Sequence, residues 1–473
     1  MLAESVAGAV FSLLSMLVIG RVIGPDATGV GTIAIAAFLM VEVFSAVLFP
    51  DALVQLPGLE RRHSNSAATA AVLLGVALGV GLAAAAPLLA ANADAPEVTW
   101  LVLALAPLLP LSAFAGTVSG LLLREQRFRL LSLRLLVGQP LALGTGLFLA
   151  SRGHGAWAMV VSQVVATVAA FLLMVLCSRP SPRPRLDLSA LRELWPVAGP
   201  QMAGVAVNVG RYRIFLLALG FVVPQALLAV SHFGFRLLDA ALGVVWQCTG
   251  RLAMPRLCAL QNDREAMAEA YGDLAQFQAL LGLPICAGIA LTAPDMVDVL
   301  LGPAWAGTAE ATRVVGLAAM AAVLHGDQSS LFVAVGKARR NFHVAVAALL
   351  LPLAALAVLR PGTPQEVSYV WSAQCLILPP VLAFVVLREL RRSVWWLARK
   401  VAPAVVATAI MAFVVLLLQN AFMMPPLMRL LVTASGGAAA YAAAAWAALG
   451  GRLPRALLTS SPAPRPSQQP SRA

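Results

Sequence analysis

Charged residues and cysteines are scarce in this chain. Asp, Glu, Lys and Arg make up only 11% of the 473 residues, against about 25% in an average soluble domain. The five cysteines are widely spaced and form no C-x-x-C pair, so they indicate neither a disulfide framework nor a thiolate metal site. A Walker-type phosphate loop is also missing, which argues against direct use of ATP. We therefore expect no enzyme activity, no cofactor and no metal.

Long apolar runs dominate the sequence instead. Hydrophobic residues make up 60% of the chain and the mean hydropathy is +0.86, which indicates an all-α polytopic membrane protein. At about 20 residues per spanning helix, the length accommodates about 12 to 14 spans. We predict about fourteen spans, at residues 1–20, 27–50, 67–91, 97–122, 130–151, 154–177, 196–222, 224–250, 275–293, 308–336, 343–360, 365–387, 402–420 and 427–449.

The basic residues between these spans alternate in density. One set of connecting segments, together with the C-terminal tail, carries 25 of the 33 Lys and Arg residues, whereas the opposite segments hold only Arg21, Arg152 and Arg360. Basic residues concentrate on the cytoplasmic side of a membrane protein. This split predicts a multi-pass protein of the bacterial inner membrane with both termini in the cytoplasm, and it explains the net charge of +12 without nucleic acid.

The spans group into five predicted regions. They are an N-terminal six-helix lobe (1–178), a cytoplasmic linker (179–195), a C-terminal six-helix lobe (196–387), a helix pair (388–450) and a disordered cytoplasmic tail (451–473), whose Pro, Ser, Gln and Arg residues offer no core.

Two short polar segments add detail to the cytoplasmic side. Residues 262–277 are rich in helix formers and predict a short amphipathic helix on the cytoplasmic surface. Residues 391–400 place two tryptophans beside basic residues, a pattern typical of an anchor at the membrane interface.

Charged residues inside the apolar spans are the best candidates for function. Arg211 and Arg213 fall near the middle of one span, and Arg236 and Asp239 near the middle of the next. A charge at mid-bilayer costs about 2.5–3.5 kcal/mol on insertion scales, so such residues face water or a partner. Arg211 and Arg213 are about 200° apart on a helix, so both cannot point straight into one cavity. Arg236 and Asp239 are three residues apart and form either a structural ion pair or part of a site.

Protonatable groups near the membrane are the candidates for ion coupling. They are Glu42, Asp239 and Asp327, since coupled transport by protons or sodium needs such a group. His325 is better explained as a hydrogen-bonded helix residue than as a ligand.

Several short motifs occur in a characteristic order. They are G-R-V-I-G-P at 20–25 with Gly29, P-D-A-L-V-Q at 50–55, R-E-Q-R-F at 124–128, G-H-G-A-W-A at 153–158, M-P-R-L at 254–257 with Asp263 and Tyr271, G-P-A-W at 302–305, and A-V-G-K at 334–337. The chain thereby resembles the polysaccharide transporter family (O-antigen, lipopolysaccharide or exopolysaccharide flippases) of the multidrug/oligosaccharidyl-lipid/polysaccharide exporter superfamily. The resemblance covers about residues 10–345.

The resemblance implies a flippase that moves polyprenyl-pyrophosphate-linked oligosaccharides across the bacterial inner membrane by alternating access. Its partners would be the lipid bilayer, the lipid-linked glycan and possible polysaccharide polymerases and chain-length regulators. Arg211, Arg213 and Arg236 would bind the substrate in a cationic cavity, because guanidinium groups form bidentate bonds to phosphate.

The sequence departs from the family at the start of the second lobe and leaves alternatives open. Relatives often carry an aspartate near the position of Arg211 and Arg213. The alternatives are a cation-coupled multidrug exporter, a peptidoglycan lipid-precursor flippase, and a membrane glycosyltransferase or polymerase. An exporter of cationic drugs would favour an acidic or aromatic cavity, and the last class needs a large external catalytic loop. The glycan, the coupling ion, the oligomeric state and the position of the true N-terminus stay undetermined.

Overall fold

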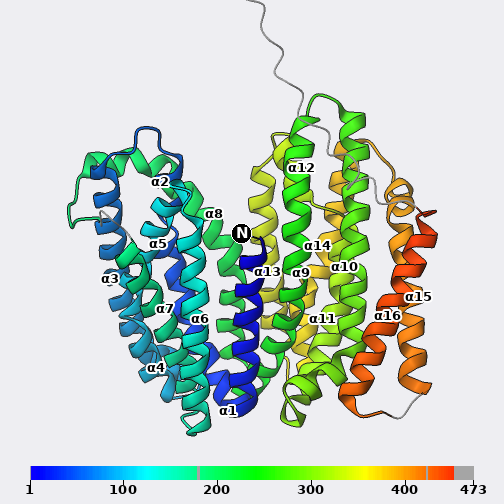
Figure 1. Cartoon of the computed structure of the whole chain (residues 1–473), viewed down its shortest axis with the longest axis horizontal. Helices are drawn as coiled ribbons and strands as arrows, with labels where there is room; N and C mark the ends of the chain where they lie inside the picture. Colours follow the sequence, from blue (N-terminus) through cyan, green and yellow to red (C-terminus); the bar gives the residue numbers. More distant parts are fainter. Residues whose placement is uncertain (1, 178–181, 422–423, 452–473) are drawn as a thin grey trace, which may run out of the picture. The chain divides into compact units, whose positions relative to one another are not determined.

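The fold is entirely helical over the residues that the structure, a computed structural model, describes: 2–177, 182–421 and 424–451. Figure 1 shows the long helices that make up the chain. The predicted all-α polytopic class is therefore confirmed. The elements are α1 (Leu2–Ala46), α2 (Pro50–Gln55), α3 (Arg61–Asn92), α4 (Glu97–Leu105), α5 (Leu108–Arg124), α6 (Phe128–Ser151), α7 (Trp157–Cys177), α8 (Leu188–Gly220), α9 (Gln225–Ala259), α10 (Arg264–Leu300), a 3-10 turn (Pro303–Trp305), α11 (Ala306–Leu324), α12 (Gln328–Ala334), α13 (Arg339–Leu359), α14 (Pro364–Leu390), α15 (Val394–Ala421) and α16 (Pro426–Ala448).

The number of spans agrees with the prediction once the first is divided. Among the described residues, 12 segments are long and apolar enough to cross a membrane, or 13 if the bent helix α8 counts as one span. The first of them, Leu13–Gln55, is 43 residues long. It contains Gly24, whose backbone (φ 80°, ψ 171°) interrupts α1 immediately before Pro25. If the parts before and after Gly24 are counted as separate spans, the number of spans rises from 13 to 14. The break falls at a glycine because only glycine adopts this backbone region without strain.

The predicted amphipathic helix at 262–277 is not a separate element. Helix α10 runs without a break from Arg264 to Leu300, over 37 residues. At about 1.5 Å per residue it is about 55 Å long, whereas the hydrocarbon core of a bilayer is about 30 Å thick. Several of its turns therefore extend beyond the hydrocarbon, so the polar segment is the protruding end of a spanning helix.

The helices assemble into two compact units. Unit 1 comprises Met1–Ala240, Met296–Thr312 and Val344–Ala373; unit 2 comprises Ala241–Asp295, Arg313–His343 and Gln374–Ala473. The predicted linker does not separate them, since unit 1 continues from α7 through the whole of α8. The division into two six-helix lobes and a C-terminal pair stays a prediction.

The predicted linker is partly helical and is attached to α3. Its last eight residues already belong to α8. Before them, three backbone N–H groups donate to side chains of α3: Arg183 to Asn65 at 2.8 Å, Arg185 to Thr69 at 3.0 Å, and Asp187 to Ser66. These bonds fix the path of the chain into α8.

The residue that begins α8 is a typical N-cap. The Asp187 side chain accepts hydrogen bonds from Ser189 and Ala190, which satisfies two of the free N–H groups of the first turn. The bonds from Ser189 hold the pKa of the Asp187 carboxyl below its ordinary value.

The first sequence motif lies where α1 comes into close contact with other helices. A side chain at Gly29 would place its Cβ 2.0 Å from the backbone oxygen of Gln225, so the backbone of α1 directly contacts the start of α9. The guanidinium of Arg21 donates to the carbonyls of Val299 (2.7 Å) and Leu300 (3.3 Å). These are free carbonyls of the last turn of α10, which a cation stabilises.

Two further motif residues also fasten helix ends. Arg124 donates from Nη1 to three carbonyls of and just after α2, including Leu53 at 2.8 Å and Leu56 at 2.6 Å. The Trp305 ring is completely buried and stacks on Phe233 with the ring centres 4.3 Å apart. Three of the motifs behind the family resemblance thus supply contacts that hold unit 1 together.

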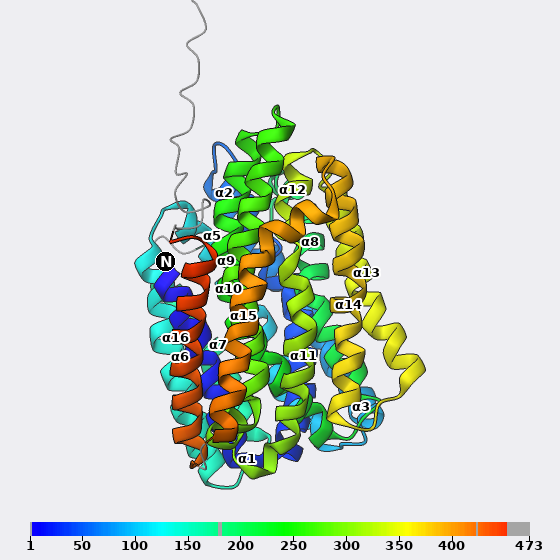
Figure 2. The ribbon, with the colours of Figure 1, turned by 90° about the vertical axis from the view of Figure 1, so that its right-hand side faces the viewer.

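Helices α15 and α16 lie side by side in unit 2 (Figures 1 and 2). The predicted interfacial anchor at the start of α15 is only half correct. Trp395 is 78% exposed, as an interfacial residue should be, but the ring of Trp396 packs against Gly272 and its N–H donates to Glu269 at 3.2 Å. The predicted disordered tail at 451–473 lies, from residue 452 on, outside the described residues.

Candidate functional site

Two cavities lined by both apolar and polar residues lie within unit 1 and share a wall. The first has a volume of about 570 Å³ and the second about 330 Å³. Gln139 of α6 and Gln163 of α7 line both of them. The charged residues predicted in the spans therefore have to be placed relative to these two cavities.

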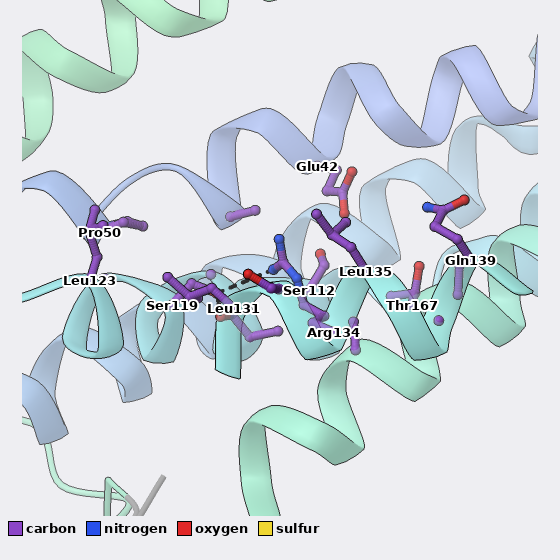
Figure 3. A pocket seen from close by; sticks show the side chains of 18 of the residues that line it. Glu42, Pro50, Ser112, Ser119, Leu123, Leu131, Arg134, Leu135, Gln139 and Thr167 are labelled. Atoms are coloured by element: carbon purple, nitrogen blue, oxygen red, sulfur yellow. Dashed lines mark hydrogen bonds between the residues drawn. The ribbon is translucent and has the colours of Figure 1, made fainter. Parts of the chain in front are cut away.

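Glu42 and Arg134 face the first cavity (Figure 3). Glu42 comes from the second half of α1 and Arg134 from α6, and the hydroxyl of Ser112 interacts with the Glu42 carboxylate. The Arg134 guanidinium donates to Ser119 at 3.2 Å. Arg134 was counted among the 25 basic residues between the spans, although the predicted span 130–151 contains it. That count is wrong at this position, because Arg134 lies inside α6 and lines the cavity.

Arg213 and Arg236 line the second cavity together with Tyr212 and His232. The Tyr212 hydroxyl and His232 Nδ1 form a hydrogen bond of 2.7 Å. Tyr212 also packs edge-on against Trp371, with ring centres 5.1 Å apart. Helices α8 and α9 therefore each contribute one ring and one guanidinium group to the cavity.

The position of Arg213 is set by helix α1. Its guanidinium donates a hydrogen bond to the backbone carbonyl of Leu39, one turn before Glu42 on the same face of α1. Arg213 interacts attractively with Glu42 and repulsively with Arg236. Two guanidinium groups that repel each other across one cavity leave room for an anion between them.

Arg211 does not line either cavity. As its angular separation from Arg213 requires, its side chain is directed elsewhere on α8, and it acts together with Arg236 on the Asp239 carboxylate. Asp239 is exposed and forms no direct ion pair with Arg236 among the described contacts. The three predicted arginines are thus divided, two in the cavity and one near Asp239. Their roles stay predictions.

Asp327, the third predicted coupling residue, belongs to unit 2 and caps a helix. Its carboxylate accepts from the backbone N–H groups of Ser329 (3.1 Å) and Ser330 (3.2 Å), and from the Ser330 hydroxyl (2.6 Å). This capping begins α12 after the break at Gly326. A role in ion coupling stays a prediction, and the capping bonds already occupy much of the carboxylate.

His325 shows an unexpected combination next to this break. Its backbone carbonyl accepts a 2.5 Å hydrogen bond from the Tyr271 hydroxyl, whereas its buried ring nitrogen Nδ1 has no partner in the protein. The side chain is therefore not the hydrogen-bonded helix residue that the sequence suggested.

Sequence reasoning missed three of the cavity residues. Arg134 was counted with the loops because it follows two other arginines closely, and Tyr212 and His232 carry no charge. Their signal was spacing: Tyr212 lies between Arg211 and Arg213 in the sequence, and His232 precedes Arg236 by one helical turn. Within the described ranges, no group of three or more His, Cys, Asp or Glu side chains could hold a metal.

The fold is that of a known class of membrane transporter. The lipid II flippase MurJ in its inward closed conformation matches with a TM-score of 0.77 and 13% identity, over 94% of this chain and 97% of that one. An inward-facing multidrug resistance transporter of the MATE family and MOP superfamily matches with a TM-score of 0.63 and 16% identity, over 81% and 95%. At these identities the likeness shows the fold.

Residues 18–310 match the family described as polysaccharide biosynthesis protein, and the chain belongs to that family. The succinoglycan biosynthesis transport protein ExoT of Rhizobium meliloti (strain 1021) is 25% identical over 64% of this chain. The teichuronic acid biosynthesis protein TuaB of Bacillus subtilis (strain 168) is 20% identical, over 68% of each chain. The match spans 61% of the length of ExoT.

Proposed function

We propose that the protein is a flippase that moves polyprenyl-pyrophosphate-linked oligosaccharides across the bacterial inner membrane for surface polysaccharide synthesis. The observation that carries the proposal is the joint lining of one cavity by Arg213 and Arg236. The family, the likeness to a lipid II flippase and a relative that transports succinoglycan support it.

The chemistry of the second cavity suits a phosphate-linked glycan. Guanidinium groups form strong, charge-assisted bonds to phosphate oxygens, and each is planar and permanently charged. The hydroxyls and amides beside them, including Thr32, Ser162 and Gln163, can exchange hydrogen bonds with sugar hydroxyls. The cavity therefore offers guanidinium groups to the pyrophosphate of the substrate and uncharged polar groups to its glycan.

The same lining weighs against the alternatives in this superfamily. A cationic drug would be repelled by the two arginines, so a cation-coupled multidrug exporter fits the second cavity poorly. A flippase for the peptidoglycan lipid precursor would handle the same pyrophosphate, and only the glycan separates it from the leading proposal. We also propose that the protein has no enzyme activity. Contact with a polysaccharide polymerase or a chain-length regulator is likewise part of the proposal.

Deletion of the gene tests the proposed function. We expect a lipid-linked glycan to accumulate on the cytoplasmic leaflet, and expression of the intact chain to restore surface polysaccharide. Accumulation of the peptidoglycan precursor instead, with cell lysis, would identify the protein as a flippase of the alternative kind. Normal surface polysaccharide and no lipid-linked intermediate would contradict both.

The orientation, with both termini cytoplasmic, is part of the proposal and rests on the distribution of basic residues. Single cysteines at Ser64, near the start of α3, and Asn92, at its end, test it in a variant without native cysteines. An impermeant thiol reagent added to intact cells should modify the probe at Asn92 and leave the probe at Ser64 unmodified. Labelling with the reverse pattern would overturn the orientation; both probes should react once the cells are opened.

A further inference from the structure

We propose that Glu42 is an internal competitor for the substrate's phosphate. Its carboxylate neutralises Arg213 while the second cavity is empty, and it turns to Arg134 when an anion occupies Arg213. The inference rests on the proposed function and assigns Glu42 to substrate release, as a positioning residue that acts through Arg213.

The geometry of α1 places Glu42 between two arginines on different helices. The bond from Arg213 of α8 to the Leu39 carbonyl brings that guanidinium onto the face of α1 that carries Glu42. On the other side, Arg134 of α6 lines the same cavity as Glu42 (Figure 3). Both arginines interact attractively with the Glu42 carboxylate.

Neither arginine holds Glu42 in a direct ion pair. Among the described contacts, no salt bridge of 4.0 Å or less joins Glu42 to Arg134 or to Arg213. The guanidinium groups bond instead to Ser119 and to the Leu39 carbonyl. A carboxylate that is attracted from two sides but fixed by neither can shift at little cost, because it exchanges one attraction for another.

The distribution of charge makes such a shift useful. Arg213 and Arg236 repel each other in the second cavity, so an anionic phosphate should bind there strongly. A tightly held substrate leaves slowly, since differences in affinity appear mainly in the rate of dissociation. A carboxylate that returns from Arg134 to Arg213 would displace the phosphate and speed its release.

Binding of inorganic pyrophosphate to the purified, full-length protein in lipid nanodiscs tests the competition. Calorimetry would compare the intact protein with Glu42→Gln, which keeps size and hydrogen bonding but removes the charge. We expect Glu42→Gln to bind pyrophosphate about tenfold more tightly, because the attraction of Arg213 to the Glu42 carboxylate no longer competes with the phosphate. Glu60→Gln, on an exposed glutamate that pairs with Arg62, is the matched control and should leave binding unchanged.

Arg134 supplies a change of the opposite sign. Arg134→Met removes the second partner of Glu42, so the carboxylate stays on Arg213 and pyrophosphate should bind more weakly. In the Glu42→Gln background the same substitution should have little further effect, since no carboxylate remains to compete. Folding defects cannot produce this pattern, because a misfolded protein would not bind more tightly.

The outcomes separate the two proposals. Pyrophosphate binding that depends on Arg213 but is unchanged or weaker in Glu42→Gln would overturn the competition alone. An equal loss from Arg134→Met with and without Glu42 would do the same. If neither the intact protein nor Glu42→Gln binds pyrophosphate, the cationic substrate site itself fails, and the competition with it. In surface-polysaccharide assays, Glu42→Gln should export more slowly at normal abundance despite its tighter binding.

Discussion

The acidic residues deep within the helices of the two units are arranged differently. In unit 1, Glu42 and Asp239 lie near arginines without a direct ion pair. In unit 2, Asp295 is 4% exposed and Arg429 holds it in a bidentate pair, with Nε 2.9 and 3.0 Å from the two carboxylate oxygens. Direct pairing offsets part of the desolvation cost of a buried charge but also leaves it unavailable to a ligand.

Other charges of unit 2 follow the pattern of Asp295. Lys400 bonds to Asp273 at 2.8 Å and to Glu269 at 2.9 Å. Glu389 accepts from Lys337 at 2.7 Å and from Arg340 at 2.8 Å. These pairs connect helices far apart in the sequence, as the pairs of Arg62 and His63 with Glu193 also do between α3 and α8 of unit 1. Unit 1 differs in that further charged side chains line its cavities.

Reversal of the cavity charges should have the largest effect on function. We expect Arg213→Glu or Arg236→Glu to reduce export about 100-fold or more, as loss of a charge-assisted bond of up to about 3 kcal/mol requires. The measurement is surface polysaccharide in a deletion strain, with membrane abundance followed in parallel. Near-normal export by both variants at normal abundance would remove the contrast between the units.

The buried pair of unit 2 should instead govern stability. Arg429→Met leaves the Asp295 carboxylate buried without its partner, which should cost about 3–5 kcal/mol and lower membrane abundance several-fold. Thermal unfolding in detergent would measure the loss. The double variant Asp295→Leu with Arg429→Met removes both charges and should recover most of the stability; failure to recover would mean that the pair does more than neutralise itself.

A conservative change sharpens the contrast within unit 1. Arg213→Lys keeps the charge but loses the planar fork that binds two phosphate oxygens, so export should fall about tenfold, the value of one modest hydrogen bond. Arg211→Lys is the natural comparison, because Arg211 lies outside the lining of the cavity and should tolerate the change. Equal sensitivity of both positions would place Arg211 in the substrate path as well.

The exposed pairs of unit 2 should matter least. Lys337→Met leaves Glu389 its second partner, Arg340, and exposed ion pairs contribute about 0–1 kcal/mol. We expect thermal stability to change by less than about 1 kcal/mol and export to stay near normal. A loss as large as that of Arg429→Met would show that burial does not separate strong pairs from weak ones here.

The sequence predicted the helices well because hydropathy and turn signals are local. The break between the first two predicted spans was indicated by Gly24 and Pro25. The family motifs were recognised before their contacts were known. Those contacts, such as Gly29 against Gln225, are long-range and have no signal in hydropathy. The motifs therefore indicated the fold reliably but said little about the site.

The site was only partly predictable, because the direction in which a side chain points matters as much as its position in the sequence. Arg213 and Arg236 were found through their cost in a membrane, and Arg211 was found by the same rule although it faces elsewhere. Arg134 was missed because a count of basic residues between spans depends on where a helix starts. Asp327 was predicted as a coupling group, but the sequence alone does not distinguish an aspartate that caps a helix from one that couples ions.

The pair between Asp295 and Arg429 also has a consequence for biosynthesis. The two residues are 134 positions apart, and translation proceeds at about 5–20 residues per second. Asp295 is therefore added to the nascent chain about 7 to 27 s before Arg429. A nascent chain that stops before α16 carries Asp295 without Arg429, so the neutralisation of this acid in α10 depends on the synthesis of α16.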